Sequence, residues 1–206
     1  MKITKNVLAI LFLFLSSSKV FADSPLTSTE FYKAYSTEII IKEAAKSNGI
    51  LTSKLKIYLA DPLQSIDVKM ALINRLGWKA KGKKNSKIFM RYLKKIRGFK
   101  TDESLINSMS GEDLTCLAYI KAMDNYFDVE KALEYSNLAI KKSPNSFTTN
   151  IINALLKSQK FQNNNSCKVY QVLEDVRVNS SLKYDFKKEA TDVIFEYVTM
   201  YKKYCK

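Results

Sequence analysis

Glycine and proline, the residues that most often interrupt regular structure, occur only five and three times in this chain of 206 residues. A chain with so few turn-forming residues is most simply built from helices. Apolar residues recur at helical spacing in one segment after another, and none of these segments alternates in the sustained way that a strand requires. We therefore predict an all-α fold.

We expect about eight or nine helices, arranged as an array of antiparallel helix pairs that is either repeat-like or an irregular bundle. The first begins at Ser28 or Thr29 and continues to about Lys46. The following "SKLKIYLAD" is a short helix or an extended segment that Pro62 stops. The remaining segments are 65–76, 85–97, 101–109, 112–125, 129–142, 147–160, 166–177 and 186–204.

The first 22 residues have the features of a secretory signal peptide. Lys2 and Lys5 precede "VLAILFLFL", an apolar run that is too short to cross a bilayer. Val20 and Ala22 are small residues at the positions that a signal peptidase reads. We expect cleavage between Ala22 and Asp23, and therefore a periplasmic or secreted protein. The short apolar run argues against the alternative, an uncleaved anchor.

The expected mature chain, 23–206, is long enough for one all-helical domain or for two parts that share a core. In the second case 23–100 would form an N-terminal subdomain and 101–206 a C-terminal part. The net charge of +14 falls to +11 when the three lysines of the first 22 residues are removed. A net charge this positive favours an anionic binding partner, but it does not indicate any particular fold.

Three cysteines and no histidine are present. Export permits a disulfide, and the odd number leaves at least one thiol unpaired. We expect Cys116, on an apolar helix face, to be a buried free thiol, and a bridge to join Cys167 with Cys205. In a simple hairpin of 166–177 and 186–204, however, Cys205 would overshoot its partner by roughly 15 Å, unless the tail folds back.

The segment from Leu117 to Ser146, "LAYIKAMDNYFDVEKALEYSNLAIKKSPNS", contains small residues where two helices would approach closely. The small residues are Ala118 and Ala122 in the first helix and Ala132 and Ala139 in the second, which also carries Tyr135. Pro144 follows and ends the second helix. The pattern resembles a tetratricopeptide-type helix pair. The resemblance implies a scaffold that binds another protein or peptide in a groove, and it implies no catalysis. A generic antiparallel array is the alternative explanation.

The absence of histidine excludes Ser-His-Asp and Cys-His catalysis and imidazole zinc sites. The cysteines are too far apart for a metal knuckle, and no glycine-rich phosphate loop is present. We therefore expect no catalytic residues, no metal and no cofactor. A carboxylate-dependent hydrolase of the cell envelope is the alternative, with Glu30 and Glu38 as the early acidic residues.

The segment 77–100, "GWKAKGKKNSKIFMRYLKKIRGFK", contains ten lysines or arginines and no acidic residue. If its second half is helical, Ile88, Phe89, Tyr92, Leu93 and Ile96 face inward. Four cations then lie in the loop beside Trp78 and four on the outward face of the helix. We call these eight residues the basic patch: Lys79, Lys81, Lys83, Lys84, Lys87, Arg91, Lys94 and Lys95.

The basic patch is either a solvated helix face or a surface that binds an anionic partner. The leading hypothesis is an exported, non-catalytic binding protein of the bacterial envelope that acts through protein–protein contacts. An immunity or inhibitor protein covering an acidic toxin or enzyme is a concrete version. A binder of anionic lipid or glycan is a further alternative, whereas export and the lack of an RNA-binding aromatic signature argue against nucleic acid.

Overall fold

The computed structural model describes residues 24–206, and every regular element in that range is a helix. This confirms the all-α prediction. The described range contains eleven α-helices, so the expected eight or nine is too low. The predicted signal peptide and its cleavage site between Ala22 and Asp23 lie outside the described residues.

Between residues 24 and 206, none of the helices combines the length and the apolar character needed to cross a membrane.

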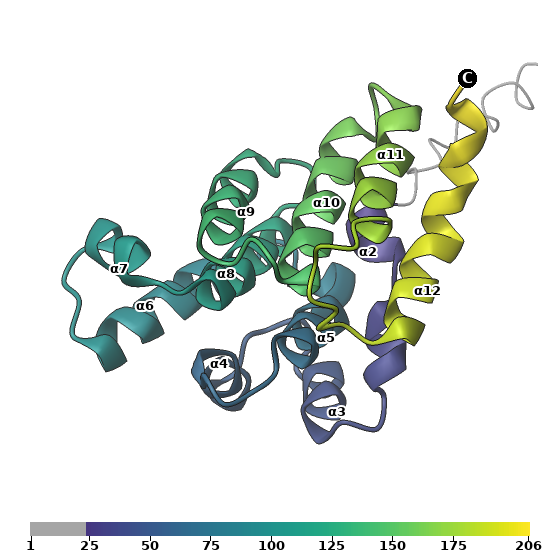
Figure 1. Cartoon of the computed structure of the whole chain (residues 1–206). Coiled ribbons are helices and arrows are strands. Elements are labelled where there is room, and N and C mark those ends of the chain that lie inside the picture. The colour runs from purple at the N-terminus through teal and green to yellow at the C-terminus, as the bar shows by residue number, and fades with distance from the viewer. Residues whose placement is uncertain (1–23) are drawn as a thin grey trace, which may run out of the picture.

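Six α-helices and two short 3₁₀ helices make up the N-terminal half (Figure 1). They are α2 (Pro25–Ser28), η1 (Phe31–Tyr35), α3 (Ile39–Lys46), α4 (Ser53–Ala60), α5 (Ile66–Leu76), η2 (Gly77–Ala80), α6 (Asn85–Arg97) and α7 (Asp102–Ser108).

The single helix expected from Ser28 or Thr29 to Lys46 is wrong, because the chain breaks there into α2, η1 and α3. The side chain of Asn74 in α5 accepts a hydrogen bond from the backbone N–H of Tyr32 at 3.0 Å, which takes this donor away from a helix ladder. The segment "SKLKIYLAD" is helical as α4. This break and this additional helix account for the higher helix count.

The C-terminal half contains five helices and a final 3₁₀ segment. They are α8 (Gly111–Asp124), α9 (Glu130–Lys142), α10 (Phe147–Phe161), α11 (Ser166–Arg177), α12 (Lys188–Val198) and η3 (Thr199–Tyr204). Each helix from α8 to α11 packs against the next one (Figure 1). At the contact of α8 with α9, a Cβ added to Gly111 would collide with the side chain of Ser143.

One hydrophobic core extends through both halves of the chain. It includes Leu72 of α5, Phe89 of α6, Leu117 of α8 and Ile194 of α12. Inside it, the buried amide of Asn74 donates to the backbone carbonyl of Thr29 and to the hydroxyl of Tyr119. These three buried polar groups are thus paired with one another, as burial away from water requires.

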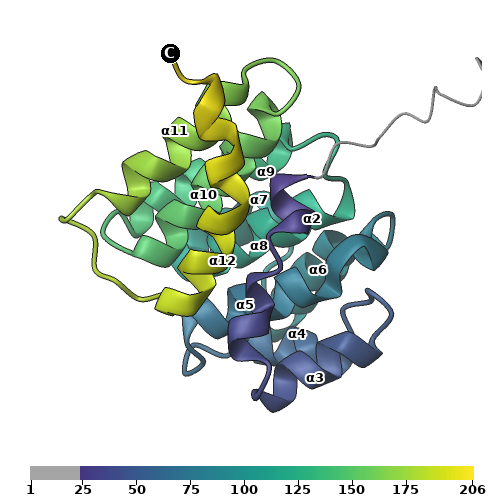
Figure 2. The same ribbon diagram turned by 90° about the vertical axis from the view of Figure 1, so that its right-hand side faces the viewer.

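The two ends of the described chain meet in space, with α2 beside α12 in Figure 2. The hydroxyl of Tyr35 in η1 accepts a hydrogen bond from the backbone N–H of Lys187 at 3.1 Å. The ring of Phe31 packs edge-on against that of Phe186, with centroids 5.3 Å apart. The beginning of α12 is therefore fixed on the N-terminal helices.

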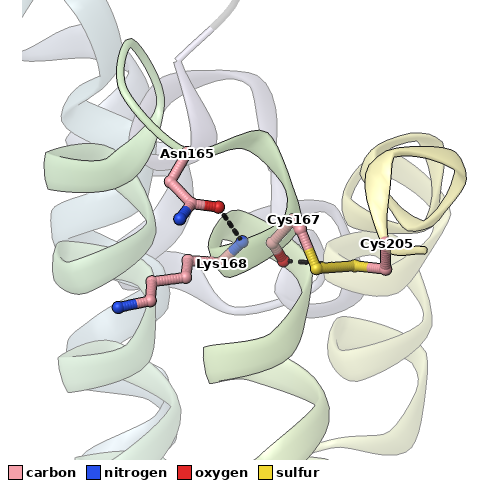
Figure 3. Close-up of a disulfide and its surroundings, with 4 residues drawn as sticks. All are labelled: Asn165, Cys167, Lys168 and Cys205. Carbon is pink, nitrogen blue, oxygen red and sulfur yellow. Dashed lines mark hydrogen bonds between the residues drawn. A yellow bond between two sulfur atoms is a disulfide. The ribbon is translucent and has the colours of Figure 1, made fainter.

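Cys167 and Cys205 form a disulfide with their Cα atoms 4.8 Å apart (Figure 3). The expected overshoot does not occur, because 178–187 is not a tight turn. The backbone N–H of Phe147 at the start of α10 donates to the carbonyl of Lys183, and that of Thr148 donates to the carboxylate of Asp185. The chain thus passes beyond the end of α11 before α12 begins (Figure 1). The final turns can then reach Cys167 without folding back.

Cys116 is fully buried in α8 and unpaired, as predicted. Burial raises the pKa of its thiol to about 12, so almost none of it is the reactive thiolate at neutral pH.

Thiol labelling with iodoacetamide, read out by mass, should therefore give three different results. We expect no label on the native protein, one label after denaturation without reductant, and three labels after denaturation with reductant. Two or more labels on denatured, unreduced protein would contradict the disulfide.

Candidate binding site

The helix α6 places the basic patch at one end of the molecule, where it lies with α7 away from α11 and α12 (Figure 1). Its apolar residues Phe89 and Leu93 are completely buried. Gly98, at a φ of 73°, ends the helix in the left-handed conformation that glycine adopts without strain. The bounds of α6, Asn85–Arg97, agree with the prediction.

The N-terminus of α6 is held by Asp124, the last residue of α8. Its carboxylate accepts hydrogen bonds from the backbone N–H groups of Asn85 and Ser86, at 2.7 and 2.8 Å, and from the Ser86 hydroxyl at 2.7 Å. A negative charge at this end of a helix also interacts favourably with the helix dipole. The backbone carbonyl of Asp124 accepts from Gly82, so the lysine-rich loop is attached at the same point.

The C-terminal end of α6 is held by an ion pair with α8. The guanidinium of Arg97 donates two hydrogen bonds to the carboxylate of Asp113, at 2.8 and 2.9 Å. Burial on its own would raise the pKa of Asp113, but the bonds from Arg97 and from Ser110 outweigh it and hold the pKa below its usual range. With both ends attached to α8, α6 presents its outer face as a rigid surface.

Seven of the eight patch residues are exposed and make no ion pair within the described chain. Lys94 is the one patch residue with an ion pair among the described residues, to Asp102 of α7 at 2.5 Å. The other seven are Lys79, Lys81, Lys83, Lys84, Lys87, Arg91 and Lys95. Elsewhere some lysines do pair with acidic residues of their own helix, as Lys188 does with Asp192 at 2.7 Å.

A groove of about 440 Å³ lies between α4 and α6. We call it the α4–α6 groove; it is lined by Ser53, Lys56, Ile57, Ile88, Arg91, Tyr92, Lys95 and Ile96. Ile57 and Ile96 are 53% and 50% exposed, so the inward orientation expected for Ile96 is wrong. Of the residues expected to face inward, only Phe89 and Leu93 are fully buried. The groove thus combines an apolar floor with three cations and no carboxylate.

Three aromatic side chains pack together beside the lysine-rich loop. Trp78 meets Tyr126 edge-on with centroids 5.5 Å apart, and Tyr126 lies 4.6 Å from Phe127. Trp78 and Phe127 are about half-exposed or more, and the ammonium of Lys81 lies 4.1 Å from the Phe127 ring centroid. An exposed aromatic cluster under a cation extends the basic patch at its loop end.

Glu30 and Glu38, the residues considered for a hydrolase, lie on either side of η1. Lys33 pairs with Glu30 at 2.7 Å, and this hydrogen bond lowers the pKa of the Glu30 carboxyl. A general acid needs the opposite shift, since it must be protonated near neutral pH. Among the described residues there is also no group of three or more His, Cys, Asp or Glu side chains arranged to hold a metal ion.

No protein-family model matches this chain, and neither a curated protein nor a solved structure shows significant similarity to it.

Proposed function

We propose that this protein is an exported, non-catalytic helical binding protein whose basic patch binds the acidic surface of another protein. The observation that carries the proposal is the set of seven exposed patch cations without an intramolecular ion pair in the described chain. Like charges gathered on α6 and the loop before it repel one another, and an acidic partner would remove that repulsion. A protein that inhibits an acidic toxin or enzyme, or gives immunity to it, is the specific role that we favour.

Export is the part of the proposal that rests on the N-terminal sequence and on the disulfide. The bridge between Cys167 and Cys205 fits an oxidising compartment such as the periplasm or the extracellular space. In that setting the patch would meet proteins, lipids and glycans of the envelope.

Two alternatives have less support. The hydrolase requires a protonated Glu30, and the pairing with Lys33 opposes protonation. Binding to anionic lipid or glycan is favoured by the exposed Trp78 and Phe127, since aromatic and basic residues together are typical of membrane-surface contacts. Three of the seven cations, however, lie on α6, beyond that small cluster: Lys87, Arg91 and Lys95.

A charge-reversal experiment tests the protein-partner proposal. The variant Lys79→Glu/Lys83→Glu/Lys87→Glu should lose at least one partner that the wild-type protein captures from a periplasmic extract. The captured partner should also be released by salt, because exposed charges are screened over about 8 Å at physiological ionic strength. Capture is measured by quantitative mass spectrometry at low and high salt.

A matched control separates the patch from net charge. The variant Lys141→Glu/Lys157→Glu/Lys206→Glu makes the same charge change at three exposed lysines outside the patch. We expect it to keep the salt-sensitive partner. Equal loss in both variants, or an unchanged partner list in both, would refute the role of the patch. Capture of anionic lipid in place of a protein would favour the lipid alternative.

A further inference from the structure

We propose that the α4–α6 groove binds an acidic amphipathic helix of the partner protein. This inference rests on the proposed function and specifies it, because it names the part of the patch that makes contact and the chemistry of the segment that it contacts. Three features of the groove carry it: the spacing of its apolar floor, the position of its cations and its shape.

The floor of the groove has the periodicity of a helix-binding surface. Ile88, Tyr92 and Ile96 are spaced by four residues on α6 and form one continuous stripe. Ile57 of α4 forms the opposite wall. The stripe is about 12 Å long at 1.5 Å rise per residue, which corresponds to roughly two helical turns of an occupant. A helix with apolar residues at positions i, i+4 and i+7 would match this length.

The cations lie on both sides of that floor. Arg91 and Lys95 are one turn apart on α6, and neither makes an ion pair within the described chain. Lys56 lies on α4, with its ammonium 5.4 Å from the centroid of the Tyr92 ring. Positive charge is therefore distributed along the groove on both walls. An occupant with carboxylates flanking an apolar stripe complements this arrangement.

Other anionic ligands fit the same features less well. A fatty acid carries one charge at one end and would leave two of the three cations without a partner. Single-stranded nucleic acid needs aromatic platforms for its bases, whereas two of the three floor residues are isoleucines and Lys56 covers the one tyrosine. A bilayer is flat and contacts protruding side chains, whereas this floor lies in a hollow between two helices.

A synthetic peptide tests the inference with the full mature protein, disulfide intact. The probe is a fluorescein-labelled peptide of about 18 residues, long enough to form a helix, with leucines on one face and glutamates beside them. A second peptide has the same composition in an order that places the leucines all around the helix. Fluorescence anisotropy measures the affinity of both. We expect the amphipathic peptide to bind at least about tenfold more tightly than the reordered one.

Matched variants locate the binding on the protein. Ile57→Ser/Ile96→Ser removes exposed apolar side chains from the groove and should weaken binding at least about tenfold. Ile39→Ser/Leu63→Ser changes isoleucine and leucine side chains that are 71% and 89% exposed elsewhere, and binding should be unchanged. Amide NMR shifts induced by the peptide should be confined to α4 and α6. Circular dichroism checks that each variant is folded. Both variants replace only exposed residues, so the hydrophobic core is unchanged.

The outcomes separate this inference from the function on which it rests. One set of results would refute the groove proposal but not the patch proposal. In it, both peptides bind equally, Ile57→Ser/Ile96→Ser has no effect, and Lys79→Glu/Lys83→Glu weakens binding. If neither peptide binds and the extract yields no salt-sensitive protein, both are wrong. Binding to phosphatidylglycerol vesicles that Ile57→Ser/Ile96→Ser abolishes, without peptide binding, would assign the groove to lipid and overturn the helix proposal.

Discussion

Replacing both Cys167 and Cys205 with serine should lower the free energy of unfolding by about 4 kcal/mol. The physical reason is the length of the loop that the bridge closes, since the two cysteines are 38 residues apart in sequence. Opening the bridge allows the unfolded chain many more conformations, and the cost follows from the entropy of closing a loop of that length. Urea denaturation followed by circular dichroism measures the change.

The wild-type protein treated with reductant should show the same loss, and reductant should have no further effect on the double variant. Changing both cysteines avoids a free thiol that could form intermolecular bridges. A denaturation midpoint that does not move on reduction would show that the bridge contributes nothing to stability, contrary to the expectation from loop length.

The second large effect is expected at Asp124. The change Asp124→Ala should cost about 3 kcal/mol, because three donors at the start of α6 lose a charged acceptor. The groove and the basic patch depend on the position of α6, so partner binding should weaken together with stability. Thermal denaturation measures the first effect and the capture experiment the second.

Two comparisons make the Asp124 prediction specific. Asp124→Asn keeps one acceptor oxygen and should recover part of the lost stability. Asp128→Ala removes the same residue type four positions later, where the carboxylate is exposed and accepts one longer hydrogen bond from Glu130, at 3.3 Å. It should cost less than about 1 kcal/mol. Equal losses for Asp124→Ala and Asp128→Ala would contradict the anchoring role.

The helices themselves could be predicted wherever the local sequence determines them. For α6, the apolar residues at helical spacing and Gly98 after the last turn were sufficient to give its bounds. The predicted bounds of α8 to α11 also agree with the structure to within a residue. Where distant residues compete for the backbone, the prediction failed. The 28–46 segment has helical spacing, but Asn74 takes the N–H of Tyr32, and that side chain lies on another helix.

The candidate site was predictable only in part, for the same reason. Helical spacing identifies the outward cations of α6, but it cannot show that Lys94 pairs with Asp102 on α7. The groove exists because Ile57 of α4 lies across from Tyr92 of α6, and no local pattern relates those two residues. Asp124 belongs to the acidic segment "DNYFD", and nothing in that segment indicates that its carboxylate holds the start of a different helix.

The hydrogen bond between Tyr35 and Lys187 connects residues 152 positions apart. Since α2 and η1 pack on α12 as well as on α10 and α5, these N-terminal helices cannot complete their native contacts until almost the whole chain has left the ribosome. Until then, the part of the hydrophobic core that α12 covers stays exposed to water. A protein that lacks α2 or α12 should therefore leave apolar core surface uncovered, and we expect it to be degraded by proteases faster than the complete chain.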